Sequence, residues 1–200
     1  MTRLVPVRLL LPLLAALAGP PPAASHEAHA VLPSGIFAAE ELHPARVTLV
    51  DQTGAPHPFR DEIIGDGPVV ITFVYSSCTT VCPVANAIFE MMQTELDARG
   101  DTRTRLVSIT VDPRRDTPER LAAMAADFGA GPRWSFWTGA VGDVEEALRS
   151  MGVPVGRVED HDPMFLVRGA RDQDFVRVLG LPEPDELFAV LDGSDSEPSP

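Results

Sequence analysis

The chain contains two cysteines, Cys78 and Cys82, in the stretch SSCTTVCP, and their spacing limits the chemistry they can perform. Side chains four positions apart near a helix start can lie about 5–6 Å from each other, which suits both a disulfide bond and two thiolates on one metal ion. A purely structural disulfide would add little stability, because so short a loop removes little entropy from the unfolded chain. The pair therefore indicates a redox dithiol, a peroxide-reducing centre or half of a metal site.

The segments on either side of the cysteines predict where the pair lies. Residues 66–77 form a nearly continuous run of apolar and β-branched side chains, which predicts a strand buried on both faces. A helix is expected from Pro83 to Gly100, with Cys82 near its N-cap, where the helix dipole favours a thiolate. The cysteines would then follow the carboxyl end of a central strand, where ligand sites of open α/β sheets collect.

The rest of the chain alternates between strand and helix patterns. Thr117 and Pro118 suit the N-cap and the first position of a helix. The alternation predicts an α/β sheet with helices on both faces. Strands are expected within 46–54, 104–111, 164–168 and 174–180, and helices within 116–129, 141–152 and 182–192.

The two ends of the chain differ from its middle. Residues 1–25 have two arginines, a short apolar run and then small residues, which predicts a secretory signal peptide with cleavage after residue 25 or as late as residue 30. An uncleaved membrane anchor is the alternative, although the apolar run is about half the roughly 20 residues that a spanning helix needs. Residues 26–45 are expected to be a linker, 46–192 one domain, and 193–200 a disordered tail.

The composition excludes some classes of protein. Hydrophobic residues make up 44% of the chain, which is enough for a packed core. The formal charge is −13, and removal of a signal segment with two arginines and no acidic residue would leave −15. So acidic a surface argues against binding of nucleic acid or of anionic membranes.

A metal site would need a further ligand besides the two thiolates, and His161 is the best candidate. It lies in VEDHDPMFLV, directly before a predicted strand, so its loop could reach over the cysteines. A lone histidine in a loop is more often a plain surface residue. Two thiolates and one imidazole would suit copper, whereas a structural zinc site usually has a fourth protein ligand.

Two further pairs of residues have both a structural and a functional interpretation. Asp112 and Asp116 can form a turn and support a helix start, or they can orient a partner or the cysteine loop. Met91 and Met92 carry soft thioether groups, but their helical spacing places at least one of them in the core.

The tryptophans and the first histidines complete the candidates. Trp134 and Trp137 are expected to pack a loop after the helix within 116–129. His26 and His29 would lie near a mature amino terminus, where they could capture Cu(II) weakly.

Four stretches together resemble the Sco/SenC family of exported, thioredoxin-like copper proteins. They are SSCTTVCPV, SITVDPRRDTPERL, RWSFWTG and DHDPMFLV, and the similarity runs from about residue 46 to residue 191. The resemblance implies a thioredoxin-like fold with a central mixed β-sheet flanked by helices. It also implies that Cys78, Cys82 and His161 bind one copper ion, as Cu(I) and also as Cu(II). We expect a monomer in the periplasm or at the outer face of the inner membrane.

The same resemblance implies a role in assembling the dinuclear copper site of cytochrome c oxidase. The protein would be a metallochaperone that delivers copper to the copper-site subunit or another copper protein, a reductase of the target's cysteines, or both. The alternative is a thiol-disulfide oxidoreductase that works through a Cys78–Cys82 disulfide without copper delivery. A third hypothesis is a peroxidase, because TTVCP resembles a peroxiredoxin centre with Cys82 as the peroxidatic residue. Tyr75 stands where that family has a proline.

Overall fold

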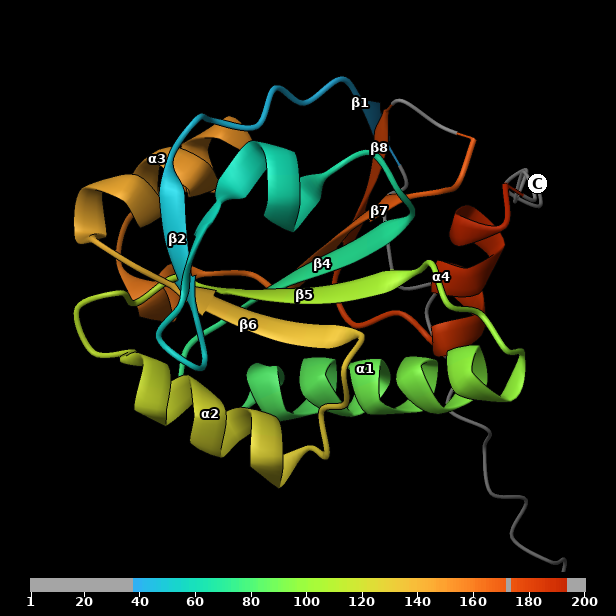
Figure 1. Ribbon diagram of the computed structural model, residues 1–200, viewed down its shortest axis with the longest axis horizontal. Helices are drawn as coiled ribbons and strands as arrows, with labels where there is room; N and C mark the ends of the chain where they lie inside the picture. Colours follow the sequence, from blue (N-terminus) through green and yellow to red (C-terminus); the bar gives the residue numbers. More distant parts are fainter. Residues whose placement is uncertain (1–37, 172–173, 194–200) are drawn as a thin grey trace, which may run out of the picture. The chain divides into compact units, whose positions relative to one another are not determined.

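The computed structural model describes residues 38–171 and 174–193, which all fall within one compact unit (Figure 1). The predicted signal peptide, most of the predicted linker with His26 and His29, and the tail after residue 193 lie outside the described residues. Within the described ranges, no helix is both long and apolar enough to cross a membrane.

An eight-stranded mixed sheet lies at the centre, in the order β1-β8-β7-β4-β5-β6-β2-β3. β4, β5 and β6 run parallel, whereas β7 pairs with β4, and β8 with β7, in antiparallel fashion. The mixed sheet that the family resemblance implies is thereby confirmed. The strands are β1 (Ala38–Glu40), β2 (Thr48–Asp51), β3 (Pro56–Pro58), β4 (Val69–Val74), β5 (Arg105–Thr110), β6 (Trp134–Thr138), β7 (Met164–Arg168) and β8 (Phe175–Leu179).

Helices cover both faces of this sheet (Figure 1). One face packs against α1 (Val81–Ala98), α2 (Pro118–Asp127) and α4 (Pro184–Leu191). The other face packs against α3 (Val141–Ser150) and a short π-helix (Phe59–Ile64).

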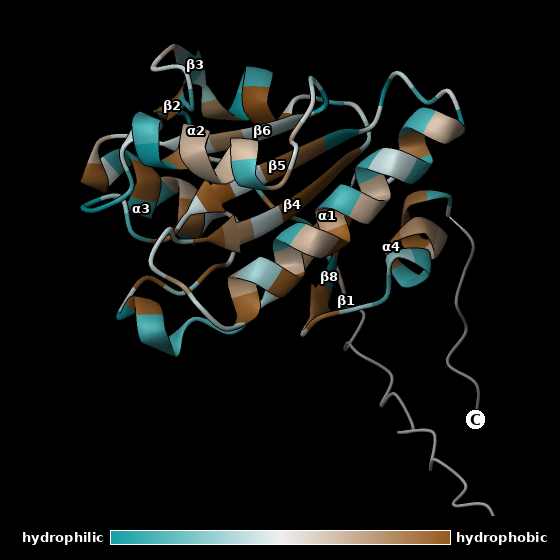
Figure 2. Ribbon diagram, turned by 90° about the horizontal axis from the view of Figure 1, so that it is seen from below, coloured by the Kyte–Doolittle hydropathy of each residue, from teal (hydrophilic) through white to brown (hydrophobic). Residues whose placement is uncertain are grey.

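The double cover explains the composition of the central strand. All six residues of β4 are buried, as its continuous apolar sequence predicts. Val70 and Val74 belong to the core beneath α1, and Ile71 and Phe73 belong to the core beneath α3. Figure 2 shows β4 and β5 as hydrophobic ribbons, while α1 alternates between polar and apolar residues along its length.

The two helix starts near the cysteines differ in how well the sequence predicts them. α2 has Thr117 as N-cap, accepting a hydrogen bond from the Arg120 backbone N–H, and Pro118 as its first residue, as predicted. The expected start of the other helix at Pro83 is wrong, because α1 begins at Val81. Proline is tolerated throughout a first helical turn, where backbone N–H groups have no partner within the helix. Cys82 therefore lies inside the first turn and not at the N-cap.

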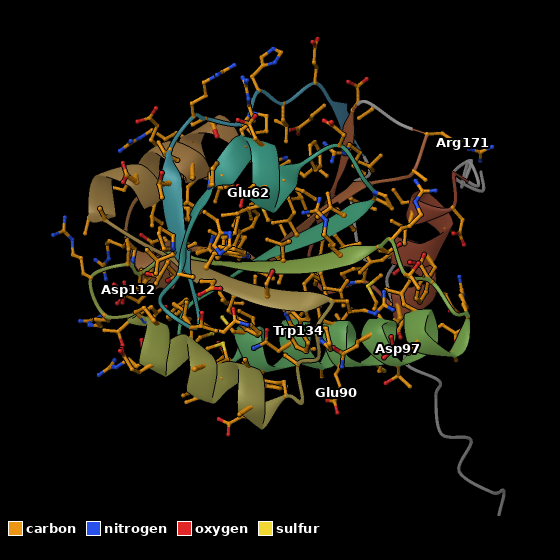
Figure 3. All side chains as sticks on the ribbon, in the orientation of Figure 1. Glu62, Glu90, Asp97, Asp112, Trp134 and Arg171 are labelled. Atoms are coloured by element: carbon orange, nitrogen blue, oxygen red, sulfur yellow. The ribbon has the colours of Figure 1, made fainter. Side chains whose placement is uncertain are left out.

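The two tryptophans, which are expected to pack a loop after the helix within 116–129, lie on a strand. Residues 134–138 form β6, which pairs with β5. The Trp134 ring is buried against Phe89 of α1, and its Nε1–H donates to Ser108 Oγ at 2.9 Å (Figure 3). This strand depends on its pairing with β5, in which Leu106 lies opposite Trp134, and no local pattern reveals that pairing.

The sheet also begins earlier than the sequence predicts. Residues 38–40 fall in the expected linker but form β1, which pairs with β8. Glu40 of β1 accepts two hydrogen bonds from the Arg177 guanidinium of β8, at 2.6 and 2.7 Å. The folded unit therefore starts before residue 46.

Glu40→Ala should lower the free energy of unfolding by about 1–3 kcal/mol, because Arg177 is almost buried and would lose both carboxyl oxygens. The hydrogen bond to Arg177 lowers the pKa of Glu40. This stabilisation should therefore be present above the ordinary pKa of 4.5 and be lost as the pH falls below it. Urea unfolding measures both effects. Glu41→Ala is the matched control, since that side chain is 76% exposed, and equal losses in both variants would contradict the prediction.

Candidate functional site

The structure brings the two cysteines together just beyond β4. Cys78 lies in the loop between β4 and α1, in a turn closed by a hydrogen bond from its N–H to the Tyr75 carbonyl at 3.1 Å. The backbone N–H of Cys82, in the first turn of α1, donates to Cys78 Sγ at 3.2 Å. Both thiols are free. The site therefore combines a dithiol with a helix start, as the sequence predicts.

The two thiols have different environments. Burial would raise the pKa of Cys78, but hydrogen bonds from the Cys82 thiol, from backbone N–H groups and from Tyr75 outweigh it and lower the pKa to about 7. Burial raises the pKa of Cys82 to about 12, and its hydrogen bond to Cys78 adds to the shift. Cys78 is partly exposed, whereas Cys82 is only 3% exposed. Cys78 is therefore the more acidic and more accessible thiol.

Asp116 fixes the loop that carries Cys78. Its carboxyl group is buried and accepts hydrogen bonds from the Ser76 N–H at 3.1 Å, from the Ser76 hydroxyl, and from the Thr110 hydroxyl at 2.6 Å. Its backbone carbonyl accepts a hydrogen bond from the Thr138 hydroxyl at 2.7 Å. Asp116 thus connects the ends of β4, β5 and β6. Of the two roles the sequence allows, orientation of the cysteine loop is the one this geometry supports.

Asp112 has a smaller role in the structure. Its carboxyl group lies 3.3 Å from the guanidinium of Arg115, whose side chain is 62% exposed. Its backbone carbonyl accepts hydrogen bonds from the N–H groups of Arg115 and Asp116. The turn-forming interpretation therefore fits Asp112.

His161 lies between a 3₁₀ turn (Val158–Asp160) and β7, with its ring packed edge-on against Phe73 of β4 at a centroid distance of 6.1 Å. Its Nε2 is buried and has no hydrogen-bond partner. Burial lowers the pKa of the ring, which favours the neutral form. A neutral imidazole with an unused nitrogen is the form that binds metal ions.

The three candidate ligands do not form a complete cluster. Among the described residues, no three His, Cys, Asp or Glu side chains lie close enough together to hold a metal ion. His161 lines a cavity of about 150 Å³ with Arg157 and Asp160, whereas the cysteines line a different cleft. The donor set nevertheless fits copper, because it consists of two thiols and a buried imidazole nitrogen without a partner. Ligation by His161 stays a prediction.

Tyr75 and Ser76 contribute to the site in ways the sequence did not reveal. A hydrogen bond to Cys78 raises the pKa of Tyr75 to about 12, so its hydroxyl stays protonated and can donate to the thiolate. Ser76 is the residue that Asp116 holds. The signal in the sequence was the position of two polar residues between a buried strand and a cysteine.

Met91 and Met92 lie in different environments, as their helical spacing predicts. Met92 is fully buried in the core beneath α1, while Met91 is 50% exposed on the outer side of the helix. Neither lines the cleft beside the cysteines.

Comparison with known proteins agrees with the fold. Residues 39–177 match the family model described as SCO1/SenC. A SCO1 protein homolog of Bacillus subtilis (strain 168) is 33% identical over 96 residues, which are 46% of this chain and 49% of the relative. The chain spans about half the length of the curated relatives it matches.

Solved structures share the architecture. BsSco, a member of the Sco family of cytochrome c oxidase assembly proteins, aligns with a TM-score of 0.62 and 23% identity, covering 81% of this chain and 96% of that one. Yeast Sco1 with copper bound aligns with a TM-score of 0.60 and 23% identity, covering 78% and 94%. At these identities the likeness concerns the fold, and it confirms the thioredoxin-like class.

In the reduced protein, iodoacetamide should modify Cys78 at a rate that rises with pH and reaches half its maximum near pH 7, because the thiolate is the nucleophile. Cys82, with a pKa of about 12, is the internal control and should react slowly over the same range. Mass spectrometry of the digested protein measures both rates. Equal modification of the two cysteines at pH 7 would show that their environments do not differ.

Asp116→Asn should lower the free energy of unfolding by about 2–4 kcal/mol, because an amide oxygen cannot accept all the hydrogen bonds that the buried carboxyl group accepts. It should also raise the pKa of Cys78 measured by alkylation, since the loop loses its anchor. Asp112→Asn is the matched control and should change stability by less than about 1 kcal/mol. The loop-anchoring role is wrong if Asp116→Asn leaves both quantities unchanged.

Proposed function

The chain belongs to the SCO1/SenC family, and from this premise we propose that it is an exported copper-binding protein acting in the assembly of cytochrome c oxidase. Copper would be its cargo, and the copper-site subunit of the oxidase, or another copper protein, would be its partner. The proposal draws on copper-bound yeast Sco1 and on the description of BsSco as a cytochrome c oxidase assembly protein. Export to the periplasm or the outer face of the inner membrane rests on the signal pattern of residues 1–25.

The observation that carries the copper proposal is the pairing of two free thiols with a partnerless imidazole nitrogen at one end of the sheet. Cys78, Cys82 and His161 would be the ligands. Thiolates favour Cu(I), and the imidazole would also allow Cu(II). His161 needs no deprotonation, because burial already keeps its ring neutral.

The exposure of the two sulfurs favours delivery. Cys78 is the sulfur that solvent and a partner can reach, and Cys82 is enclosed by the start of α1. An incoming thiolate can therefore replace Cys78 first while Cys82 and His161 still hold the cargo. Such a stepwise exchange avoids release of the ion to solvent.

A second function, reduction of a partner's disulfide, is favoured by the unequal pKa values of the thiols. The Cys78 thiolate would attack one sulfur of the partner's disulfide, forming a mixed disulfide and releasing the first partner thiolate. Cys82, after losing its proton, would attack Cys78 Sγ, releasing the second partner thiolate and leaving a Cys78–Cys82 disulfide. The peroxidase hypothesis loses support, because its nucleophile would be Cys82, which burial keeps protonated.

An anaerobic Cu(I) competition titration tests the copper proposal. The reduced protein should bind one Cu(I). Each of Cys78→Ala, Cys82→Ala and His161→Ala should weaken Cu(I) binding by more than about 100-fold. Loss of a residue that only hydrogen-bonds to a metal ligand can already weaken binding by up to about 100-fold, so loss of a ligand itself should exceed that. His43→Ala is the matched control, because its side chain is 82% exposed and should leave the affinity unchanged. Wild-type affinity in His161→Ala would remove that residue from the site.

Disulfide turnover by the metal-free protein separates the two functions. The reductase function is supported if turnover is lost in both cysteine variants but kept in His161→Ala, and if the wild type does not bind Cu(I) tightly. Tight binding that depends on all three residues supports the copper protein.

A further inference from the structure

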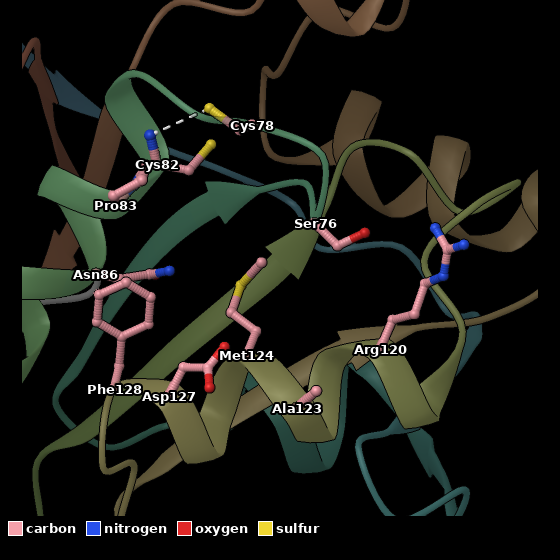
Figure 4. A pocket seen from close by; sticks show the side chains of 10 residues that line it. All are labelled: Ser76, Cys78, Cys82, Pro83, Asn86, Arg120, Ala123, Met124, Asp127 and Phe128. Carbon is pink, nitrogen blue, oxygen red and sulfur yellow. Dashed lines mark hydrogen bonds between the residues drawn. The ribbon is translucent and has the colours of Figure 1, made fainter.

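The proposed copper ligands face two separate cavities. Cys78 and Cys82 lie at one end of a cleft of about 420 Å³ between α1 and α2 (Figure 4). His161 lines a different cavity of about 150 Å³, together with Asp160. One ion can therefore contact all three ligands only if the group that separates the two spaces moves aside.

Tyr75, the first residue after β4, lies at the boundary between these cavities. Side chains of a strand alternate between its two faces, and Phe73 of β4 faces the α3 side, where the His161 ring packs against it. Tyr75 is two positions after Phe73 and falls on the same side. It lines neither cavity. Its hydroxyl nevertheless hydrogen-bonds to Cys78, which lines the first cavity, and lies within electrostatic range of Glu159, whose two neighbours line the second.

The hydroxyl group of Tyr75 connects this side chain to the dithiol. The Cys78 N–H donates to the Tyr75 carbonyl at 3.1 Å, and the Tyr75 hydroxyl hydrogen-bonds to the Cys78 thiol. Tyr75 is the single tyrosine of the chain, whereas nine phenylalanines serve as its other one-ring aromatic residues. A phenylalanine would fill the same space, so what the hydroxyl adds at this position is its contact with the sulfur.

We propose that Tyr75 is a positioning residue that caps the Cys78 sulfur in the metal-free protein and moves aside when His161 joins the two cysteines on one ion. The cap holds the accessible sulfur in place while the site is empty. It also competes with the third ligand, because its hydrogen bond has to break before the phenol can leave the boundary. The inference deepens the proposed function and rests on it in one respect, since it takes His161 as a ligand.

Raman spectroscopy of the reduced, metal-free protein tests the cap. The two bands of the tyrosine doublet change in relative intensity with the hydrogen bonding of the phenol, and in this chain they report Tyr75 alone. Cys78→Ala should change the intensity ratio. Cys82→Ala is the matched control and should keep the ratio, because Cys82 contacts Tyr75 through the backbone. Equal ratios in Cys78→Ala and the wild type would overturn the proposal.

A Cu(I) competition titration of Tyr75→Phe measures the competition with the third ligand. At about pH 9, above the Cys78 pKa of about 7, proton binding to this thiol contributes little. Tyr75→Phe should then bind Cu(I) about fivefold more tightly than the wild type, the equivalent of one net hydrogen bond. Thr80→Val is the matched control, because it removes a different hydroxyl 4.0 Å from Cys78 Sγ and should leave the affinity unchanged.

A double-mutant cycle with His161→Ala shows which ligand the phenol opposes. The gain from Tyr75→Phe should disappear in the His161→Ala background, because no third ligand then displaces the phenol. A gain of equal size in both backgrounds would show that the hydroxyl acts on the sulfur alone, and no gain in either would show that it opposes no ligand. Both results would overturn the proposal. The Raman comparison contains no metal, so failure of copper binding and failure of the cap are distinguishable.

Discussion

The buried carboxyl group of Asp116 is the contact on which the arrangement of the site depends. Parallel strands end at the same edge of a sheet, so the loops after β4, β5 and β6 meet there, and each needs its polar groups satisfied. Asp116 accepts hydrogen bonds from Ser76 and Thr110, and its carbonyl accepts one from Thr138. One residue thereby ties together three strand ends. Because Ser76 is two positions before Cys78, this junction also fixes where the first sulfur lies.

The fixed loop makes the two thiols unequal, and that difference links the two candidate chemistries. Cys78 lies outside the helix and collects hydrogen bonds, while Cys82 lies inside its first turn and is buried. A delivery protein needs one sulfur that an acceptor can reach and one that retains the ion. A reductase needs one thiolate to attack and one thiol to resolve. The same asymmetry serves both, which is why copper binding and disulfide exchange have to be separated by experiment.

Short sequence patterns predict those elements of the fold that depend on neighbouring residues alone. The apolar run of β4 and the Thr117–Pro118 start of α2 are examples, because burial on two faces and helix capping leave direct traces in sequence. β6 and β1 leave no such trace in the local sequence. β6 depends on its pairing with β5, and β1 depends on the contact between Glu40 and Arg177, which are 137 residues apart. The hydrogen bond from Ser76 to Asp116 spans 40 residues, so the sequence could suggest that this carboxyl group orients the cysteine loop but could not identify the groups it binds. The dithiol was predictable from residue types and spacing, whereas the hydrogen bonds that support its loop were not.

The two cavities at this end of the sheet separate the candidate ligands. His161 lines one of them, whereas the cysteines line the cleft between α1 and α2. The polar groups of the cysteine loop find their partners within the fold, because Asp116 accepts the hydrogen bonds of Ser76. His161 Nε2 is buried without a partner, which costs stability unless a ligand satisfies it. This difference marks His161, and not the residues that support the loop, as the candidate third ligand.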